Sequence, residues 1–198
     1  MNNTILSAKF YQRKATLVAK ELLGKLLVHK SPEGITAGMI VETEAYIGSC
    51  DKACHAYKNR SKRTEIMYHE GGCTYVYMIY GMYYCFNVVT GKKDEGDAVL
   101  IRALEPVKGI DLMHKYRGTK ITDKNLCNGP GKLCQAMMIN KELYGEPLTG
   151  KNLYIENYKK IKDSDIMSGP RINVDYAGTD KDLPWRFYIA DNKYKSNR

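Results

Sequence analysis

The 198-residue sequence contains no hydrophobic run long enough to cross a membrane, which takes about 18 consecutive apolar residues. It has no low-complexity tract and no internal repeat, and its six prolines mark turns rather than a linker. The opening residues, MNNTILSAKFYQRK, lack the apolar core of a signal peptide. These absences argue against membrane-spanning, disordered, collagen-like and coiled-coil proteins. We expect a cytoplasmic protein that is not secreted and that associates with the nucleoid if the source is bacterial.

Cysteine pairs of the kind that bind zinc are also missing. The six cysteines form no C-x-x-C motif, and the four histidines are too scattered to complete a zinc site of familiar spacing. Free thiols in a reducing cytosol are therefore expected, and no metal site is assigned. Cys50, Cys54 and His55 are close enough in sequence to leave a metal site open as an alternative.

Phenylalanine and tryptophan are scarce, with 3 Phe and 1 Trp against 16 Tyr. A protein core uses Phe as readily as Tyr. This excess of hydroxylated aromatics therefore indicates a partly hydrated surface whose rings stack on a ligand. Acidic residues are in deficit, because 31 Lys and Arg against 22 Asp and Glu leave a net charge of +9. Such a charge favours a polyanionic partner. A genome-wide base bias would give the same composition, so composition alone leaves the partner open.

Length and patterning predict one domain spanning residues 1–198. A helix is expected between a capping Thr16 and Gly24, followed by strands at KLLVHK and ITAGMIVETEAY. Another strand, DAVLIRALEP, is expected to end at Pro106. The aromatic segment 73–91 predicts two strands joined by a tight bend at Tyr80-Gly81-Met82.

Helical patterns follow in VKGIDLMHKYR and LCQAMMINK, and short strands are expected near LYIEN and WRFYIA. These elements alternate without a regular βαβ rhythm. We therefore predict a mixed α/β (α+β) fold with a mainly antiparallel sheet and flanking helices.

The segment VETEAY holds the first candidate chemistry. Alternation along a strand points Glu42 and Glu44 to one face, which is unusual for a core face and expected at a cleft. Arg102 lies inside the apolar run AVLIRALEP, where a guanidinium needs an anionic or polar partner. We predict an ion pair between Arg102 and one of the two glutamates. Spacing alone leaves a purely structural salt bridge equally open.

An arginine beside a carboxylate keeps that carboxylate ionised, as a general base must be, and the pair can hold one water molecule. Tyr46 follows Glu44 on the same strand face, and His55 and Tyr77 can reach such a site from neighbouring segments. A pocket lined in this way suits a planar aromatic ligand such as a nucleobase.

These residues lie in motifs that resemble the 3-methyladenine (alkyladenine) DNA glycosylase family. The matching segments, from about residue 7 to residue 190, are IVETEAYIG, Asp51 with Ala53-x-His55, YVYMIYGMYYCFNVV, AVLIRALEP and GPGKLCQA. The resemblance implies a single mixed α/β domain with a curved sheet and a protruding β-hairpin, here 75–88, that enters the DNA minor groove. One departure is Gly71-Gly72, where the family commonly has a Pro-Gly step; we expect it to loosen the entry to the hairpin.

The resemblance also implies an activity. Members are monofunctional DNA glycosylases that flip alkylated or deaminated purines out of duplex DNA and hydrolyse the N-glycosidic bond, which starts base excision repair. The expected substrates are 3-methyladenine and 7-methylguanine, with hypoxanthine and ethenoadenine left open. Glu44 matches the general base that activates the water, and Arg102 and the main-chain carbonyl of Ile172 match groups that hold this water.

The remaining matches concern the base and the DNA. Tyr46, His55 and Tyr77 match the residues that sandwich the flipped base. Asn87 matches the position that rejects guanine, although an ordinary strand asparagine is the alternative. Tyr80 matches the intercalating tyrosine, with Met82 beside it widening the groove. Gly131 and Lys132, in GPGK, match a loop that contacts the DNA backbone.

Hydrolysis with a carboxylate base requires no cofactor. The expected partner is double-stranded DNA that contains damaged purines, with no membrane involved, and we expect a monomer. Two alternatives remain, a non-catalytic reader of distorted duplexes and an enzyme that acts on free nucleosides. The first does not need Glu44, and the second leaves the +9 charge and Tyr80 unused.

Overall fold

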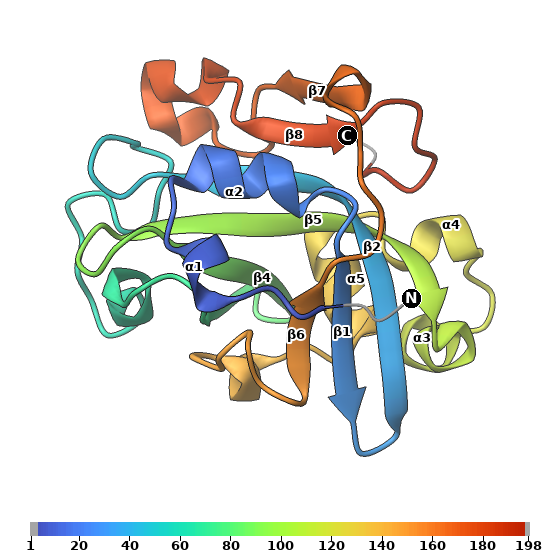
Figure 1. Cartoon of the computed structure of the whole chain (residues 1–198). Helices are drawn as coiled ribbons and strands as arrows, with labels where there is room; N and C mark the ends of the chain where they lie inside the picture. The colour runs from blue at the N-terminus through green and yellow to red at the C-terminus, as the bar shows by residue number, and fades with distance from the viewer. Residues whose placement is uncertain (1–3, 197–198) are drawn as a thin grey trace.

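The computed structural model describes residues 4–196, so both ends of the predicted range 1–198 lie outside the described residues. Its sheet has the strand order β3-β4-β5-β2-β1-β6, with β8 paired to β2 and β7 paired to β8. All strand pairs in the described range are antiparallel. The sheet is open, and helices flank it (Figure 1). The prediction of an α+β fold with a mainly antiparallel sheet is confirmed.

The strands are β1 Leu26–Ser31, β2 Gly34–Tyr46, β3 Thr74–Ile79, β4 Tyr83–Thr90, β5 Asp97–Lys108, β6 Leu153–Glu156, β7 Ile166–Gly169 and β8 Arg186–Ile189. The α-helices are α1 Ala8–Tyr11, α2 Ala15–Leu22, α3 Ile110–Arg117, α4 Asp123–Leu126 and α5 Pro130–Ala136. Four 3-10 segments complete the described chain: η1 Glu65–Tyr68, η2 Lys141–Leu143, η3 Asp163–Asp165 and η4 Asp175–Asp182. Strand β7 had no signal in the sequence.

Helix α2 covers one face of the sheet (Figure 1). The hydroxyl of Thr43 on β2 donates a 2.8 Å hydrogen bond to the carbonyl of Ala19 in this helix. Val99 and Ile101 on β5 pack with α2 in the main hydrophobic core, and Ile101 is directly opposite Thr43. Alternation along both strands therefore leaves the opposite face to Glu42, Glu44 and Arg102.

Strands β3 and β4 form the predicted hairpin. The chain reverses at Tyr80 and Gly81, which have φ of +51° and +68°, and the Met82 amide donates to the Ile79 carbonyl at 3.2 Å. Tyr80 is 79% exposed and Met82 is 67% exposed. The bend predicted at these residues is confirmed.

The entry to this hairpin is not loosened by its two glycines. The Gly71 amide donates to the Gly91 carbonyl at 3.0 Å, and the Gly72 amide donates to the Val89 carbonyl at 3.0 Å. A Cβ at Gly71 would lie 2.5 Å from the carbonyl oxygen of Tyr11, so the close packing here depends on glycine. A proline at position 71 would also lack the amide that donates to the Gly91 carbonyl.

Two helix boundaries differ from prediction. Helix α2 begins at Ala15, so Thr16 lies in its first turn and no side chain caps the helix. Helix α5 begins at Pro130, where a missing amide hydrogen is tolerated, and ends at Ala136. Met138, with φ of +53°, does not continue the predicted helical run. No helix in residues 4–196 is long and apolar enough to cross a membrane.

Pro106 does not end its strand, because β5 continues to Lys108. The register with β2 shifts at this point, where Pro106 is opposite Gly38 and Lys108 is opposite Ala37. An irregularity of this kind accommodates a residue that cannot donate to the ladder.

Candidate active site

One face of the sheet collects the side chains that the sequence analysis assigned to chemistry. Glu44 is opposite Leu100, Leu100 is opposite Asn87, and Asn87 is opposite Tyr75. Residues two positions away on each strand share this face: Glu42 and Tyr46 on β2, Arg102 on β5, Cys85 on β4 and Tyr77 on β3. Four strands therefore contribute to one surface.

The predicted ion pair is present, and Arg102 has both glutamates as partners. Its Nη1 lies 3.3 Å from Glu44 Oε2, and its Nε lies 3.2 Å from Glu42 Oε1. Glu42 also accepts from Arg186 Nη1 at 3.3 Å and from the amide and hydroxyl of Ser196. Three of these four hydrogen bonds fall on Oε1 and one falls on Oε2.

Glu44 is less fully engaged. Its Oε1 accepts the Ile172 amide at 2.7 Å, and its Oε2 accepts the Tyr46 hydroxyl at 2.8 Å and Arg102 Nη1 at 3.3 Å. With three donors among residues 4–196, the carboxylate keeps about one acceptor position, on Oε1. Glu44 is the glutamate bonded to Tyr46 and Ile172, whereas Glu42 bonds to Arg186 and Ser196 instead.

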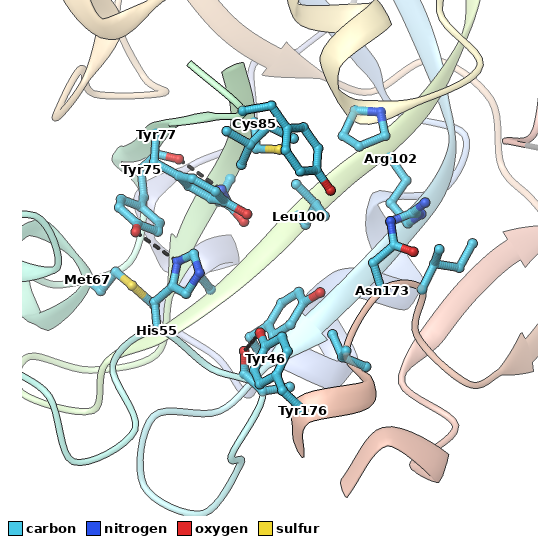
Figure 2. A pocket seen from close by; sticks show the side chains of 18 residues that line it. Tyr46, His55, Met67, Tyr75, Tyr77, Cys85, Leu100, Arg102, Asn173 and Tyr176 are labelled. Carbon is cyan, nitrogen blue, oxygen red and sulfur yellow. Dashed lines mark hydrogen bonds between the residues drawn. The ribbon is translucent and has the colours of Figure 1, made fainter. Parts of the chain in front are cut away.

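A cavity of about 230 Å³ lies over this pair. Aromatic and polar side chains line it, among them Tyr46, His55, Tyr75, Tyr77, Asn87, Arg102, Ile172 and Tyr176 (Figure 2). Glu44 has no exposed surface and reaches the cavity wall through its contacts with Tyr46, Arg102 and Ile172. The structure thus brings the predicted base-binding residues and the predicted catalytic residues to one place.

His55 and Tyr77 meet at one end of the cavity. Their rings are 4.7 Å apart in an edge-to-face arrangement, and Tyr75 stacks on Tyr77 at 5.2 Å. Tyr75, which the sequence analysis did not single out, also places its hydroxyl 3.0 Å from His55 Nδ1. This contact leaves Nε2 as the ring nitrogen available to a ligand.

Burial, with a smaller effect of the nearby Arg63 cation, lowers the pKa of His55 to about 4. The imidazole is therefore neutral at pH 7, with one nitrogen as a donor and the other as an acceptor. Burial also raises the pKa of the Tyr75 phenol, so that its hydroxyl proton is retained. The pair offers an uncharged hydrogen-bonding group to the cavity.

Asn87 and Ile172, two further predicted residues, also line the cavity. Asn87 donates from Nδ2 to the Tyr75 carbonyl at 3.0 Å, which fixes its amide. Ile172 contacts Glu44 through its amide, whereas the resemblance concerned its carbonyl. The next residue, Asn173, has a left-handed backbone conformation with φ of +60°.

The residues assigned to DNA surround the hairpin. Tyr80 both lines the cavity and projects from the hairpin tip, and Met82 is exposed beside it. Gly131 packs on Tyr83, since a Cβ there would lie 3.1 Å from the Tyr83 Cβ. Lys132 donates to Asn128 Oδ1 at 2.9 Å. Gly131 thus has a packing role that the sequence did not indicate.

Arg171 is the main site residue that sequence reasoning missed. Its buried guanidinium forms a two-pronged ion pair with Asp51 and donates to the Ala45 carbonyl at 3.0 Å. It also lies 4.8 Å from the ring centroid of Tyr46. One side chain therefore joins the end of β2, the loop that leads to His55 and the segment that contains Ile172. An arginine in a polar segment gives no sequence signal for such a role.

The alternative metal site does not form. Residues 4–196 contain no group of three or more His, Cys, Asp or Glu side chains arranged to hold a metal ion. Cys50 is an exposed free thiol, and burial raises the pKa of the Cys54 thiol to about 12.

Comparison with known proteins is consistent with this site. Residues 9–193 match the model of the family described as methylpurine-DNA glycosylase. The chain is 49% identical to the "Putative 3-methyladenine DNA glycosylase" of Clostridium novyi, over 98% of each chain. Proteins of the same name from Clostridium botulinum and Bacillus licheniformis are also 49% identical, over 98% and 96% of this chain and 100% and 96% of theirs.

An aromatic cavity over a buried carboxylate, in a chain with these relatives, defines a hydrolase that cleaves N-glycosyl bonds. Within that class the chain belongs to the methylpurine-DNA glycosylase family, whose substrate is DNA and whose role is base excision repair of DNA damage.

Proposed function

We propose that this enzyme extrudes 3-methyladenine and 7-methylguanine from duplex DNA into the aromatic cavity and releases them with a water activated by Glu44. The observation that carries the proposal is the open acceptor position of Glu44, buried against Arg102 beneath that cavity. Deaminated or etheno purines are further candidates for the same pocket. One lesion on one strand gives no symmetry reason for a dimer, so the enzyme acts as a monomer.

In the chemical step, water attacks the sugar C1′ while the N-glycosidic bond breaks. The bonding electron pair leaves with the purine, and Glu44 Oε1 takes the proton of the water. Arg102, which forms an ion pair with Glu44, and the Ile172 main chain hold the water. The negative charge of Glu44 also stabilises the positive charge that develops on the sugar. Because Glu44 has no exposed surface in the free protein, the water enters with the substrate through the cavity.

The base occupies the space between Tyr46 and the His55–Tyr77 pair (Figure 2). Purines methylated at N3 or N7 carry positive charge, and the faces of tyrosine rings attract cations. Neutral His55 adds a hydrogen bond from Nε2 without adding a repelling charge. Asn87, held by its bond to Tyr75, crowds the exocyclic amino group of guanine. Unmodified guanine, which lacks the positive charge that the tyrosine faces attract, is therefore disfavoured.

The hairpin β3–β4 enters the minor groove, and Tyr80 fills the gap that the extruded nucleotide leaves. This part of the proposal is supported by the exposure of Tyr80 and Met82 at the hairpin tip, where neither side chain packs in the hydrophobic core. Lys132 and the backbone at Gly131 lie beside the hairpin on α5, where they contact the DNA backbone.

The test is base release from methylated duplex DNA, with products separated by chromatography, for wild type beside Glu44→Gln. Glu42→Gln is the matched control, because it changes the other carboxylate of Arg102 without touching the open acceptor position. We expect wild type to free 3-methyladenine and Glu44→Gln to do so at least about 100-fold more slowly. Both should bind the duplex equally, and Glu42→Gln should lose stability but still release the base.

Release by Glu44→Gln at the wild-type rate would remove the general-base assignment. If wild type and the variant both bind damaged duplex but neither releases a base, the cavity belongs to a reader instead of an enzyme.

A further inference from the structure

Tyr176 is an exposed aromatic side chain at the cavity with no role in the function proposed above. It is 68% exposed, yet it is among the residues that line the cavity. Figure 2 shows it on the side of Tyr46, across the cavity from Tyr77. A large exposed aromatic at the edge of a ligand cavity is poised to bury its surface against the ligand.

The ring of Tyr176 is held in position. Its hydroxyl donates to the Ala53 carbonyl at 3.1 Å, two residues before His55. Within residues 4–196, no other ring or cation stacks on it. Its polar end is therefore satisfied while its face stays available, as expected for a prepared stacking surface.

The segment that contains Tyr176 is docked on the loop before His55. The Lys52 amide donates to Asp180 Oδ2 at 2.9 Å, and Ala53 packs with Val174 and Ala177. Asp180 in turn accepts a hydrogen bond from Arg171 on its carbonyl at 3.1 Å. Contacts on both sides of Tyr176 thus fix the wall that presents its ring.

We propose that Tyr176 is a further substrate-contacting residue, whose ring packs against the extruded purine at the mouth of the cavity and whose bond to Ala53 holds it there. This inference rests on the proposed function only in that a base enters the cavity. It does not require that the base be released.

Binding to three duplexes tests the inference without relying on chemistry. The probes are one duplex with a single 7-methylguanine, one with an abasic analogue that has no base to extrude, and one undamaged. Tyr176→Ala and Tyr176→Phe are compared in the Glu44→Gln background, where the base is retained. Tyr158→Ala is the matched control, since Tyr158 is also exposed but lines a different groove.

We expect Tyr176→Ala to weaken binding of the 7-methylguanine duplex about tenfold, as one lost stacking contact does, with no change on the other two duplexes. Tyr176→Phe should lose less, because it keeps the ring and loses only the tether. Tyr158→Ala should bind all three as the parent does.

A parallel loss on the abasic duplex would overturn the inference, since it would mean that Tyr176 contacts the DNA backbone or only supports the fold. Unchanged binding of the 7-methylguanine duplex by Tyr176→Ala would overturn it as well. Either result leaves the Glu44 assignment intact, because base release by the wild type and Glu44→Gln is measured separately.

Discussion

At the scale of single residues, the two ends of the cavity differ in charge. Arg102 forms an ion pair with Glu44 at 3.3 Å. His55 is buried near Arg63, so its neutral form is favoured. The site therefore has the Arg102–Glu44 ion pair at one side and an uncharged imidazole, that of His55, at the other.

The lowered pKa of His55 makes stability depend on pH in a defined direction. Its pKa falls from 6.5 to about 4 on folding, so the unfolded chain binds more protons between these values. The contribution of His55 to the free energy of unfolding is fully present above pH 6.5 and is lost as the pH falls toward 4. We expect wild type to lose about 2 kcal/mol relative to His55→Gln between neutral pH and about pH 4.5.

Urea unfolding of both proteins over this pH range measures the difference. His69→Gln, which changes an exposed histidine, is the control and should follow wild type. Parallel curves for wild type and His55→Gln would contradict the assigned protonation state.

At the scale of elements, the β3–β4 hairpin combines exposure with backbone strain. Tyr80 has φ of +51°, a left-handed conformation that costs a residue other than glycine about 1–2 kcal/mol. An exposed aromatic in this conformation gains nothing from the core that would offset the strain. Strain of this kind is typical of functional positions.

Tyr80→Gly should therefore separate stability from activity. We expect its free energy of unfolding to equal or exceed that of wild type by up to about 1 kcal/mol, because glycine relieves the strain. Release of 3-methyladenine should fall at least about tenfold, since the wedge that stabilises the extruded state is lost.

Asp191→Gly is the matched control, because Asp191 has φ of +55° in a turn after β8. It should show the same change in stability and unchanged base release. Full activity of Tyr80→Gly would remove the intercalation role.

At the scale of the whole molecule, the two faces of the sheet have different tasks. Helix α2 seals one face into the main core, and the other face is lined by polar and aromatic groups around the cavity. The net charge of +9 attracts DNA to the molecule as a whole. In the binding mode proposed above, we expect the lysines on the side of the cavity and hairpin to contact phosphates of the duplex.

Salt dependence tests this distribution. The logarithm of the binding constant for duplex DNA should fall linearly with the logarithm of salt concentration, with a slope of about −0.9 for each phosphate contacted. Lys132→Gln should make the slope less negative by about 1. Lys159→Gln should leave the slope unchanged, because Lys159 lies beside α2, away from the cavity and the hairpin. Its amide donates to the Gly24 carbonyl just after that helix.

A slope near zero for wild type would favour the alternative of an enzyme for free nucleosides. An equal effect of both lysine variants would mean that the charge acts through the field of the whole molecule rather than through contacts at α5.

The sequence by itself determined the features that depend on local backbone geometry. The two-residue period of a strand was enough to predict that Glu42, Glu44 and Tyr46 share a face. The bend at Tyr80-Gly81 followed from β-propensity interrupted by one glycine. An arginine within an apolar strand was enough to predict an anionic partner for Arg102.

Only the tertiary structure decided which glutamate bonds to the residues that line the cavity, and which residues those are. Glu42 bonds to Arg186 and Ser196, which are brought to it by the pairing of β8 with β2. Arg171 and Tyr176 reach the site from the same C-terminal region. Such contacts join residues more than a hundred positions apart and have no periodic signal, because they depend on how whole elements pack and not on the conformation of any one of them.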